Sequence, residues 1–279
     1  MRILITGAEG QLGRALARRA VGHDVISCGR DDLDVRSLSC RDVIASARPE
    51  LVINAAAMTN VDRCEGEPDR AHAINALGAR NVALGSRAAD AHLLQISTDY
   101  VFDGCKDEPY WEFDAPAPIN VYGASKLAGE RLVQEVYDRV FIVRAAWLYG
   151  LGGRNFVTRV LRLAGDRDEL SIVNNEVGSP TFCDDFADAV LELVATGAHG
   201  TYHLAGEGEC SRYEFARAIL DESGHADYPL QAADHYPRAA CPPAYAPLRN
   251  FAAEQLGVRL PPWRDGLARY FERGGGLSN

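Results

Sequence analysis

The segment "VYGASKLAGE" (121–130) places a tyrosine and a lysine four residues apart among small residues. On a helix, positions i and i+4 share one face, so Tyr122 and Lys126 are expected to point the same way. An ammonium group near a phenol, together with the positive charge of an oxidised nicotinamide, lowers the tyrosine pKa. Such a tyrosine can exchange a proton with a carbonyl oxygen. Taken alone, the Y-x-x-x-K spacing is also compatible with two surface residues that have no function, because the spacing often occurs by chance.

A second group of polar residues ends a predicted strand, in "QISTDYVFDG" (95–104). Ligands of parallel sheets bind at the carboxyl ends of the strands, where Ser97, Thr98 and Asp99 are expected. We predict that Thr98 holds the carbonyl oxygen while Tyr122 donates a proton to it. Lys126 is expected to bind the nicotinamide ribose as well.

Three glycines follow the first predicted strand, in "ITGAEGQLGRAL" (5–16). Gly7, Gly10 and Gly13 are spaced one residue wider at the start than the commonest dinucleotide-binding pattern. Glycines permit a tight turn and a close backbone approach, and free N–H groups at the helix start face a pyrophosphate. A plain turn with close helix packing is the alternative. At the first strand–helix turn of a parallel fold, the pattern predicts nucleotide binding.

The second predicted strand ends in "SCGRDDLD" (27–34), where NAD-binding proteins usually carry an acid. Arg30 stands just past the tip and can meet a 2′-phosphate, which favours NADPH, with NADH as the open alternative. A solvated loop charge beside Asp31 and Asp32 explains Arg30 equally well. Asp34 is expected to reach the adenine amino group.

Short apolar runs alternate with helical patterns through the first half of the chain. The runs at 2–6, 24–28, 51–57, 93–98 and 139–146 are predicted strands. Strands that are apolar on both faces and alternate with helices predict an α/β fold with a doubly wound parallel sheet. We assign residues 1–149 to a dinucleotide-binding domain. Residues 150–279 are expected to form mainly a smaller C-terminal substrate lobe, with some segments returning to the first domain.

The composition of the chain argues against some classes of binding partner. The net charge of −10 does not favour binding to nucleic acid or to an anionic membrane, although a local site can still be basic. No export signal and no apolar run long enough to span a bilayer are apparent. Seven scattered cysteines, without a C-x-x-C pair, are typical of reduced thiols. A cytoplasmic protein is therefore expected.

Nearly end to end, the chain resembles the extended short-chain dehydrogenase/reductases, and within them the dTDP-4-dehydrorhamnose reductase family. The glycine turn and Y-x-x-x-K are superfamily features. More specific are "ISTDYVFDG" (96–104), "RAAWLYG" (144–150) and "NNEVGSPT" (174–181), together with "PPWRDGLARYF" (261–271). The resemblance implies an NAD(P)-dependent oxidoreductase that reduces the C4 keto group of a dTDP-4-keto-6-deoxyhexose, acting as a monomer or homodimer.

The resemblance also implies roles for individual residues. Thr98, Tyr122 and Lys126 match the catalytic trio. Cofactor-binding positions are matched by Gly7, Gly10, Gln11, Leu12, Ala55 and Ala56. Trp147 takes the place of a tryptophan that packs against the sugar, and a core tryptophan is the alternative. Asp99 and Asn155 occupy substrate-pocket positions, with Asn155 expected near the phosphates, and Asn75 is expected to be structural.

Two departures from the family pattern bear on the substrate and on metals. In place of the family's R-P-x-x-S-x-L, the chain reads "CPPAYAPLRN" (241–250), with Pro242 and Ala246 at the arginine and serine positions. Residues 11–22 lack the carboxylate through which some relatives bind a metal, so no metal site is predicted. The alternatives are a reductase of another nucleotide-linked deoxysugar or streptose-type precursor, and a non-catalytic NADP-binding regulatory subunit.

Overall fold

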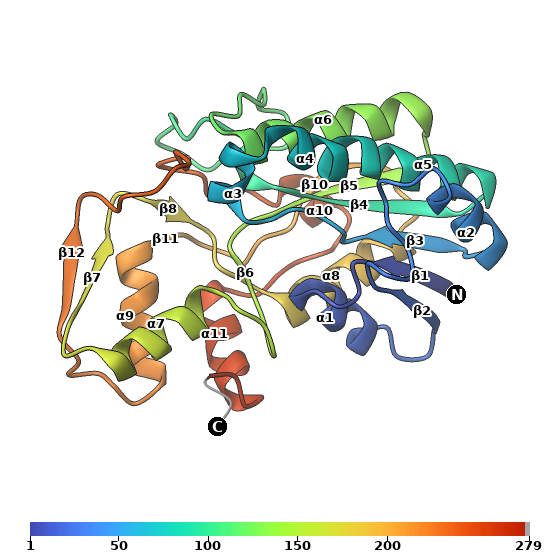
Figure 1. Ribbon diagram of the computed structural model, residues 1–279. Helices are drawn as coiled ribbons and strands as arrows, with labels where there is room; N and C mark the ends of the chain where they lie inside the picture. Colours follow the sequence, from blue (N-terminus) through green and yellow to red (C-terminus); the bar gives the residue numbers. More distant parts are fainter. Residues whose placement is uncertain (277–279) are drawn as a thin grey trace.

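Six parallel strands form the central sheet of the protein, whose computed structural model describes residues 1–276 (Figure 1). They are β1 (Arg2–Thr6), β2 (Asp24–Cys28), β3 (Leu51–Asn54), β4 (His92–Thr98), β5 (Val140–Ala145) and β10 (Gly200–His203), in the order β10-β5-β4-β3-β1-β2. All residues of β3 and β5 are buried, as expected of strands covered on both faces. The predicted doubly wound α/β fold is confirmed.

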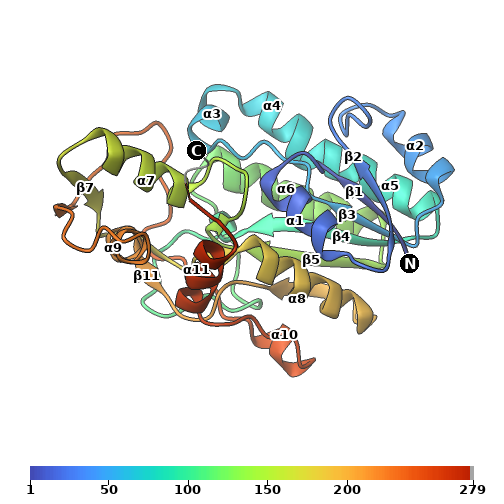
Figure 2. The same ribbon diagram turned by 90° about the horizontal axis from the view of Figure 1, so that it is seen from below.

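Helices cover both faces of this sheet (Figures 1 and 2). One layer contains α2 (Cys40–Ala47), α3 (Val61–Gly66), α4 (Pro68–His72), the π-helix η1 (Ala73–Gly78), α5 (Ala79–Ala88) and α6 (Val121–Val136). The other contains α1 (Gln11–Arg19), α8 (Cys183–Ala195) and α10 (Phe251–Gln255). Each layer buries an apolar stripe against the strands, and the two resulting cores lie on opposite faces of the sheet.

Small residues let α6 pack closely against its neighbours. A Cβ atom at Gly123 would lie 2.0 Å from the Tyr100 carbonyl oxygen, and one at Gly129 would lie 2.2 Å from the Asn75 carbonyl oxygen. Asn120 caps the helix, because its side chain accepts a hydrogen bond from the Gly123 backbone. The small residues around Tyr122 therefore bring this helix against the end of β4, which the 3-10 turn η2 (Asp99–Val101) follows.

A second group of elements follows β5 and packs around its own apolar core. It contains β6 (Leu148–Tyr149), α7 (Phe156–Asp166), β7 (Leu170–Val173), β8 (Val177–Gly178), β9 (Thr181–Phe182), β11 (Cys210–Ser211), α9 (Arg212–Glu222), β12 (Leu230–Ala233) and α11 (Trp263–Glu272). The later segments α8, β10 and α10 lie on the first sheet instead (Figure 1). The domain boundary near residue 150 stays a prediction. In residues 1–276, no helix has the length and apolar character needed to cross a bilayer.

Candidate active site

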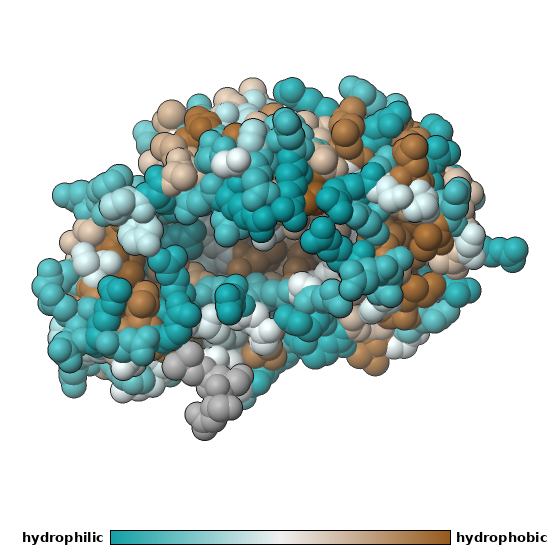
Figure 3. All heavy atoms as spheres, in the orientation of Figure 1, coloured by the Kyte–Doolittle hydropathy of each residue, from teal (hydrophilic) through white to brown (hydrophobic). Residues whose placement is uncertain are grey.

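A cavity of about 770 Å³ lies between the carboxyl ends of the strands and the second lobe. This volume is in the range of small-molecule sites. The space-filling view shows a hollow with an apolar floor between the two parts of the molecule (Figure 3). Every residue predicted at the sequence level to act in catalysis or to bind a cofactor or substrate lines this cavity.

The glycine turn lies at the carboxyl end of β1, at the topological switch point between β1 and β3. Gly7 has a φ of +65°, and a Cβ atom there would lie 2.8 Å from the Ala55 carbonyl oxygen and 2.8 Å from the Ala56 backbone. At Gly13, a Cβ atom would lie 2.3 Å from the Gly7 carbonyl oxygen. Only glycine permits this approach, which leaves a backbone cradle at the start of α1. The cradle fits the pyrophosphate of a dinucleotide.

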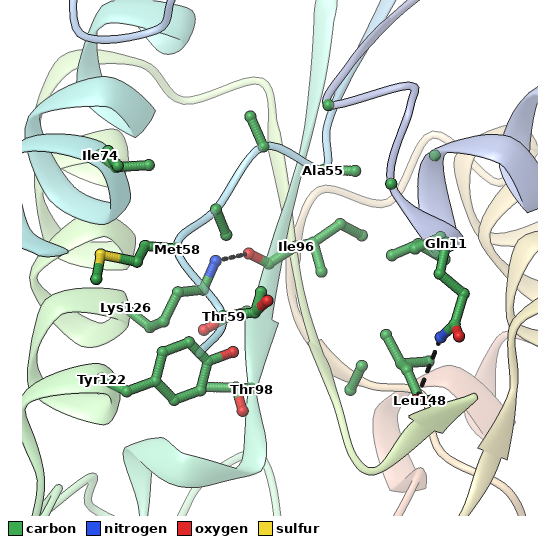
Figure 4. Close-up of a pocket in the computed structure, with 18 of the residues that line it drawn as sticks. Gln11, Ala55, Met58, Thr59, Ile74, Ile96, Thr98, Tyr122, Lys126 and Leu148 are labelled. Atoms are coloured by element: carbon green, nitrogen blue, oxygen red, sulfur yellow. Dashed lines mark hydrogen bonds between the residues drawn. The ribbon is translucent and has the colours of Figure 1, made fainter. Parts of the chain in front are cut away.

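Tyr122 and Lys126 project from α6 toward Thr98 at the end of β4 (Figure 4). Lys126 Nζ donates a hydrogen bond to the Ile96 carbonyl oxygen at 2.6 Å. Burial lowers the pKa of Lys126 to about 8, while the neighbouring Glu130 raises it. Burial raises the pKa of Tyr122 well above its usual value, and the Thr98 hydroxyl opposes this.

The predicted lowering of the Tyr122 pKa by Lys126 is therefore wrong for this structure. The lysine ammonium faces the Ile96 carbonyl, and burial of the phenol outweighs the nearby hydroxyl. A raised pKa keeps Tyr122 protonated at neutral pH, which suits a group that donates a proton.

Asp99 lies next to Thr98 and is 2% exposed. Its Oδ1 accepts a hydrogen bond from the Thr98 hydroxyl at 2.8 Å, whereas its Oδ2 has no partner among residues 1–276. Burial raises the pKa of Asp99 to about 6. An unpaired buried carboxylate oxygen beside a cavity is expected to accept a hydrogen bond from a ligand.

Two arginines line the far end of the cavity, near the tip of β2. Arg30 is exposed there, as expected. Asp34 is bound by Arg36, with Nε–Oδ1 at 2.9 Å and Nη2–Oδ2 at 2.5 Å. Hydrogen bonding by Arg36 lowers the pKa of Asp34 to about 2. The sequence analysis overlooked Arg36, which is a second candidate for a 2′-phosphate.

Gln11 and Asn155 join the two parts of the molecule. Asn155 Nδ2 donates to Gln11 Oε1 at 2.7 Å and to the Gly150 carbonyl oxygen at 2.9 Å. Its Oδ1 caps α7 by accepting from the Thr158 backbone. The structure thus gives Asn155 a capping function at the cavity wall, and its contact with substrate phosphates stays a prediction. Leu12, beside Gln11, also lines the cavity.

Trp147 belongs both to the cavity wall and to the core of the second lobe. The guanidinium carbon of Arg212 lies 3.4 Å from the centroid of its ring. A Cβ atom at Gly178 would lie 2.4 Å from Trp147 Cε2, so glycine allows β8 to pass against the indole. Arg212 begins α9 and was not singled out by the sequence, because no local motif marks it.

The cavity wall is basic although the whole chain is acidic. Eight cationic and three acidic side chains line it. The cations are Arg14, Arg30, Arg36, Arg63, Arg70, Lys126, Arg154 and Arg212, and the acids are Glu9, Asp34 and Asp99. Such a surface favours ligands with several phosphate groups.

The unusual 241–250 segment lies outside this wall. Neither Pro242 nor Ala246 lines the cavity, and Ala246 pairs through its backbone N–H with the Val177 carbonyl oxygen. Asn75 has the expected structural role, because its amide binds the Met58 backbone and donates to the Ser125 hydroxyl at 2.9 Å. Within residues 1–276, no cluster of three or more histidine, cysteine or acidic side chains could hold a metal ion.

Comparison with known proteins agrees with this geometry. A family model described as RmlD substrate binding domain matches residues 1–275. The spore coat polysaccharide biosynthesis protein SpsK of Bacillus subtilis (strain 168) is 40% identical over 275 residues, which cover 97% of each chain. The dTDP-4-dehydrorhamnose reductase of Mycolicibacterium smegmatis is 40% identical, covering 95% of this chain and 84% of that protein. A Bacillus anthracis dTDP-4-dehydrorhamnose reductase, solved in complex with NADP, has a TM-score of 0.93 and 41% identity, covering 98% of this chain and 99% of that one.

Proposed function

The chain belongs to the RmlD substrate binding domain family, and we propose that it reduces the C4 keto group of dTDP-4-dehydrorhamnose with NADPH. The observation that carries this proposal is the position of Thr98, Tyr122 and Lys126 in one cavity with the glycine cradle. A proton donor, a second hydroxyl and a cation there face the place where a dinucleotide would lie. The basic wall also suits two diphosphate-containing ligands.

NADPH, when bound, supplies the hydride for such a reduction. The glycine cradle would hold its pyrophosphate, and the carboxyl end of β3, at Ala55 and Ala56, would lie beneath it. Arg30 or Arg36 would meet its 2′-phosphate. These assignments rest on the open backbone cradle and on the arginines that line the cavity.

Residues of the chain itself carry out the proton transfer. Tyr122 remains protonated at neutral pH and donates its proton to the oxygen of the carbonyl. The Thr98 hydroxyl donates to Asp99 Oδ1 in this structure, and it would turn to donate to the carbonyl oxygen when the substrate binds. Lys126 is mostly charged at pH 7, because its pKa is about 8. Its ammonium group is held in the cavity by the Ile96 carbonyl, where it would bind the nicotinamide ribose.

The test is NADPH oxidation by the purified protein with a panel of dTDP-4-keto-6-deoxyhexoses, with the products identified by mass and stereochemistry. Turnover of dTDP-4-dehydrorhamnose to dTDP-rhamnose is expected. Preference for another member of the panel would identify a different nucleotide-linked deoxysugar as the substrate. Tight binding of NADPH without turnover of any member would contradict the proposal and favour a regulatory subunit.

A further inference from the structure

Two oppositely charged groups face the cavity with unused hydrogen-bonding capacity. Asp99 Oδ2 is buried and has no hydrogen-bond partner among the described residues. Its companion oxygen is already engaged by the Thr98 hydroxyl at 2.8 Å. A buried carboxylate oxygen without a donor costs free energy that a ligand donor would recover. This oxygen is therefore a ready acceptor beside the proposed carbonyl-binding residue.

Arg212 supplies the unused donors. Its guanidinium carbon lies 3.4 Å from the centroid of the Trp147 ring, and its side chain is 17% exposed. Its closest carboxylate is that of Glu176, with Nε–Oε2 at 3.8 Å, which is too long for a hydrogen bond. Within residues 1–276 this guanidinium group makes no side-chain hydrogen bond, although its backbone N–H binds the Glu176 carbonyl oxygen. The contact with Trp147 thus holds in place a donor that still lacks an acceptor.

The two groups lie close enough for each to shift the pKa of the other, yet no ion pair joins them. Both side chains line the same cavity, so a ligand group that enters the cavity can contact both. A hydroxyl suits this position because it donates one hydrogen bond and accepts others. A phosphate fits poorly, because it only accepts and would face the Asp99 carboxylate.

The position of Asp99 identifies which hydroxyl this is. The Thr98 hydroxyl lies 2.8 Å from Asp99 Oδ1 and in the proposed function turns to the C4 carbonyl oxygen. A group bound by the Asp99 carboxylate therefore lies on a carbon next to C4. In a 4-keto-6-deoxyhexose, C3 carries a hydroxyl and C5 carries only the methyl group and the ring oxygen. The chemistry of the pair therefore matches C3.

We propose that Arg212 and Asp99 recognise the C3 hydroxyl of the substrate, with Arg212 as donor and Asp99 as acceptor. This inference rests on the proposed function and makes it more specific. It predicts an enzyme that requires a hydroxyl beside its keto group and rejects 3-deoxy sugars. Arg212 is then a specificity-determining residue contributed by the second lobe.

The experiment compares kcat/KM for dTDP-4-dehydrorhamnose and for its 3-deoxy analogue within each variant. The ratio cancels any loss of folded protein. The wild type is expected to prefer the hydroxylated sugar by about 100-fold or more, because a site built to bind a hydroxyl leaves its polar groups unpaired when the hydroxyl is absent. Arg212→Met should reduce that preference at least about tenfold, while Arg212→Lys should retain part of it.

Arg238→Met is the matched control. Arg238 also pairs with Glu176 but does not line the cavity, so its substitution should leave the preference unchanged. NADPH affinity, measured by nicotinamide fluorescence, should be unaffected in all variants. A wild type that reduces both sugars equally well, or an Arg212→Met variant with the wild-type preference, overturns the inference and leaves the reductase function standing. If the wild type binds NADPH but reduces neither sugar, the proposed function itself fails, and the inference with it.

Discussion

Tyr122 and Lys126 lie one turn apart on α6, and burial shifts their pKa values in opposite directions. The phenol is pushed further from ionisation, whereas the ammonium group is pushed toward deprotonation. Both shifts have one cause, because each charged form loses water when the helix packs against β4. The same packing that places the two groups together therefore sets the pH range in which they can act.

The first prediction concerns the proton donor. Tyr122→Phe removes only the hydroxyl and should lower kcat/KM by about 10²–10⁴-fold, the usual contribution of general acid catalysis. NADPH binding should be nearly unchanged, because the ring remains packed edge-on against Tyr100. Steady-state kinetics and nicotinamide fluorescence check this. Near wild-type turnover would rule out Tyr122 as the donor.

A second prediction follows from the lysine. In the proposed mechanism Lys126 acts in its charged form, and its folded pKa of about 8 lies below the ordinary value of 10.5. The charged fraction therefore falls as the pH rises through about 8, and kcat/KM should fall with it. Lys126→Arg retains the charge at higher pH and should shift the alkaline limb upward, whatever its absolute rate. An alkaline limb at the same pH in both proteins would argue against Lys126 as its cause.

A third prediction separates the two arginines near the tip of β2. If Arg30 meets the 2′-phosphate, Arg30→Ala should reduce the preference for NADPH over NADH by less than about tenfold, because an exposed charge contact contributes little. Arg36→Ala is the matched comparison, since Arg36 already binds Asp34. The measurement is KM for both cofactors. A changed ratio in Arg36→Ala alone would transfer the phosphate contact to Arg36.

At the scale of elements, the first half of the chain was largely predictable. The five runs read as strands all appear in the sheet, because buried parallel strands are apolar without interruption. The run at 51–57 was too long, since β3 ends at Asn54 and Ala55–Ala57 form part of the cavity wall. Arg212 escaped notice because its place in the cavity depends on long-range packing, which no local spacing encodes. Arg36 could have been recognised, because it lies two residues after Asp34 and binds it.

The attachment of α6 to the sheet gives a fourth prediction. Glu130 binds Arg144 of β5, with Oε2–Nη2 at 2.8 Å, and accepts a hydrogen bond from Ser97 of β4 at 2.5 Å. Both charged side chains are at most 6% exposed. Glu130→Ala leaves a buried cation unpaired and should lower the free energy of unfolding by about 3–5 kcal/mol.

Urea unfolding measures this loss, and two variants control it. Asp221→Ala breaks the exposed pair with Arg217 on α9 and should cost at most about 0.5 kcal/mol. The double variant Glu130→Met/Arg144→Met removes both charges and should recover much of the stability. A Glu130→Ala protein as stable as Asp221→Ala would show that the buried pair does not hold the helix in place.

At the scale of the whole molecule, the chain crosses between its two parts more than once. After forming β6–β9 it returns to the sheet through α8 and β10, and α8 is tied to α1 by Arg18–Asp184 and Arg19–Asp188. The second lobe is therefore anchored beside the strand ends rather than attached by one linker. Its residues Arg154, Asn155 and Arg212 line the same cavity as the glycine turn.

This arrangement predicts that the nucleotide part of the substrate is needed for turnover. In the proposed function the keto group meets Thr98 and Tyr122, while the cavity wall also carries arginines from other elements. Binding energy from a remote diphosphate and base can orient the carbonyl, so its loss lowers kcat as well as raising KM. A 4-keto-6-deoxyhexose 1-phosphate should therefore have a kcat/KM at least about 10³-fold below that of the dTDP-linked sugar. Added dTDP should inhibit the full substrate competitively, which shows that the nucleotide subsite is occupied. Equal turnover of the sugar phosphate, or no inhibition by dTDP at millimolar concentration, would mean that the second lobe does not bind the nucleotide.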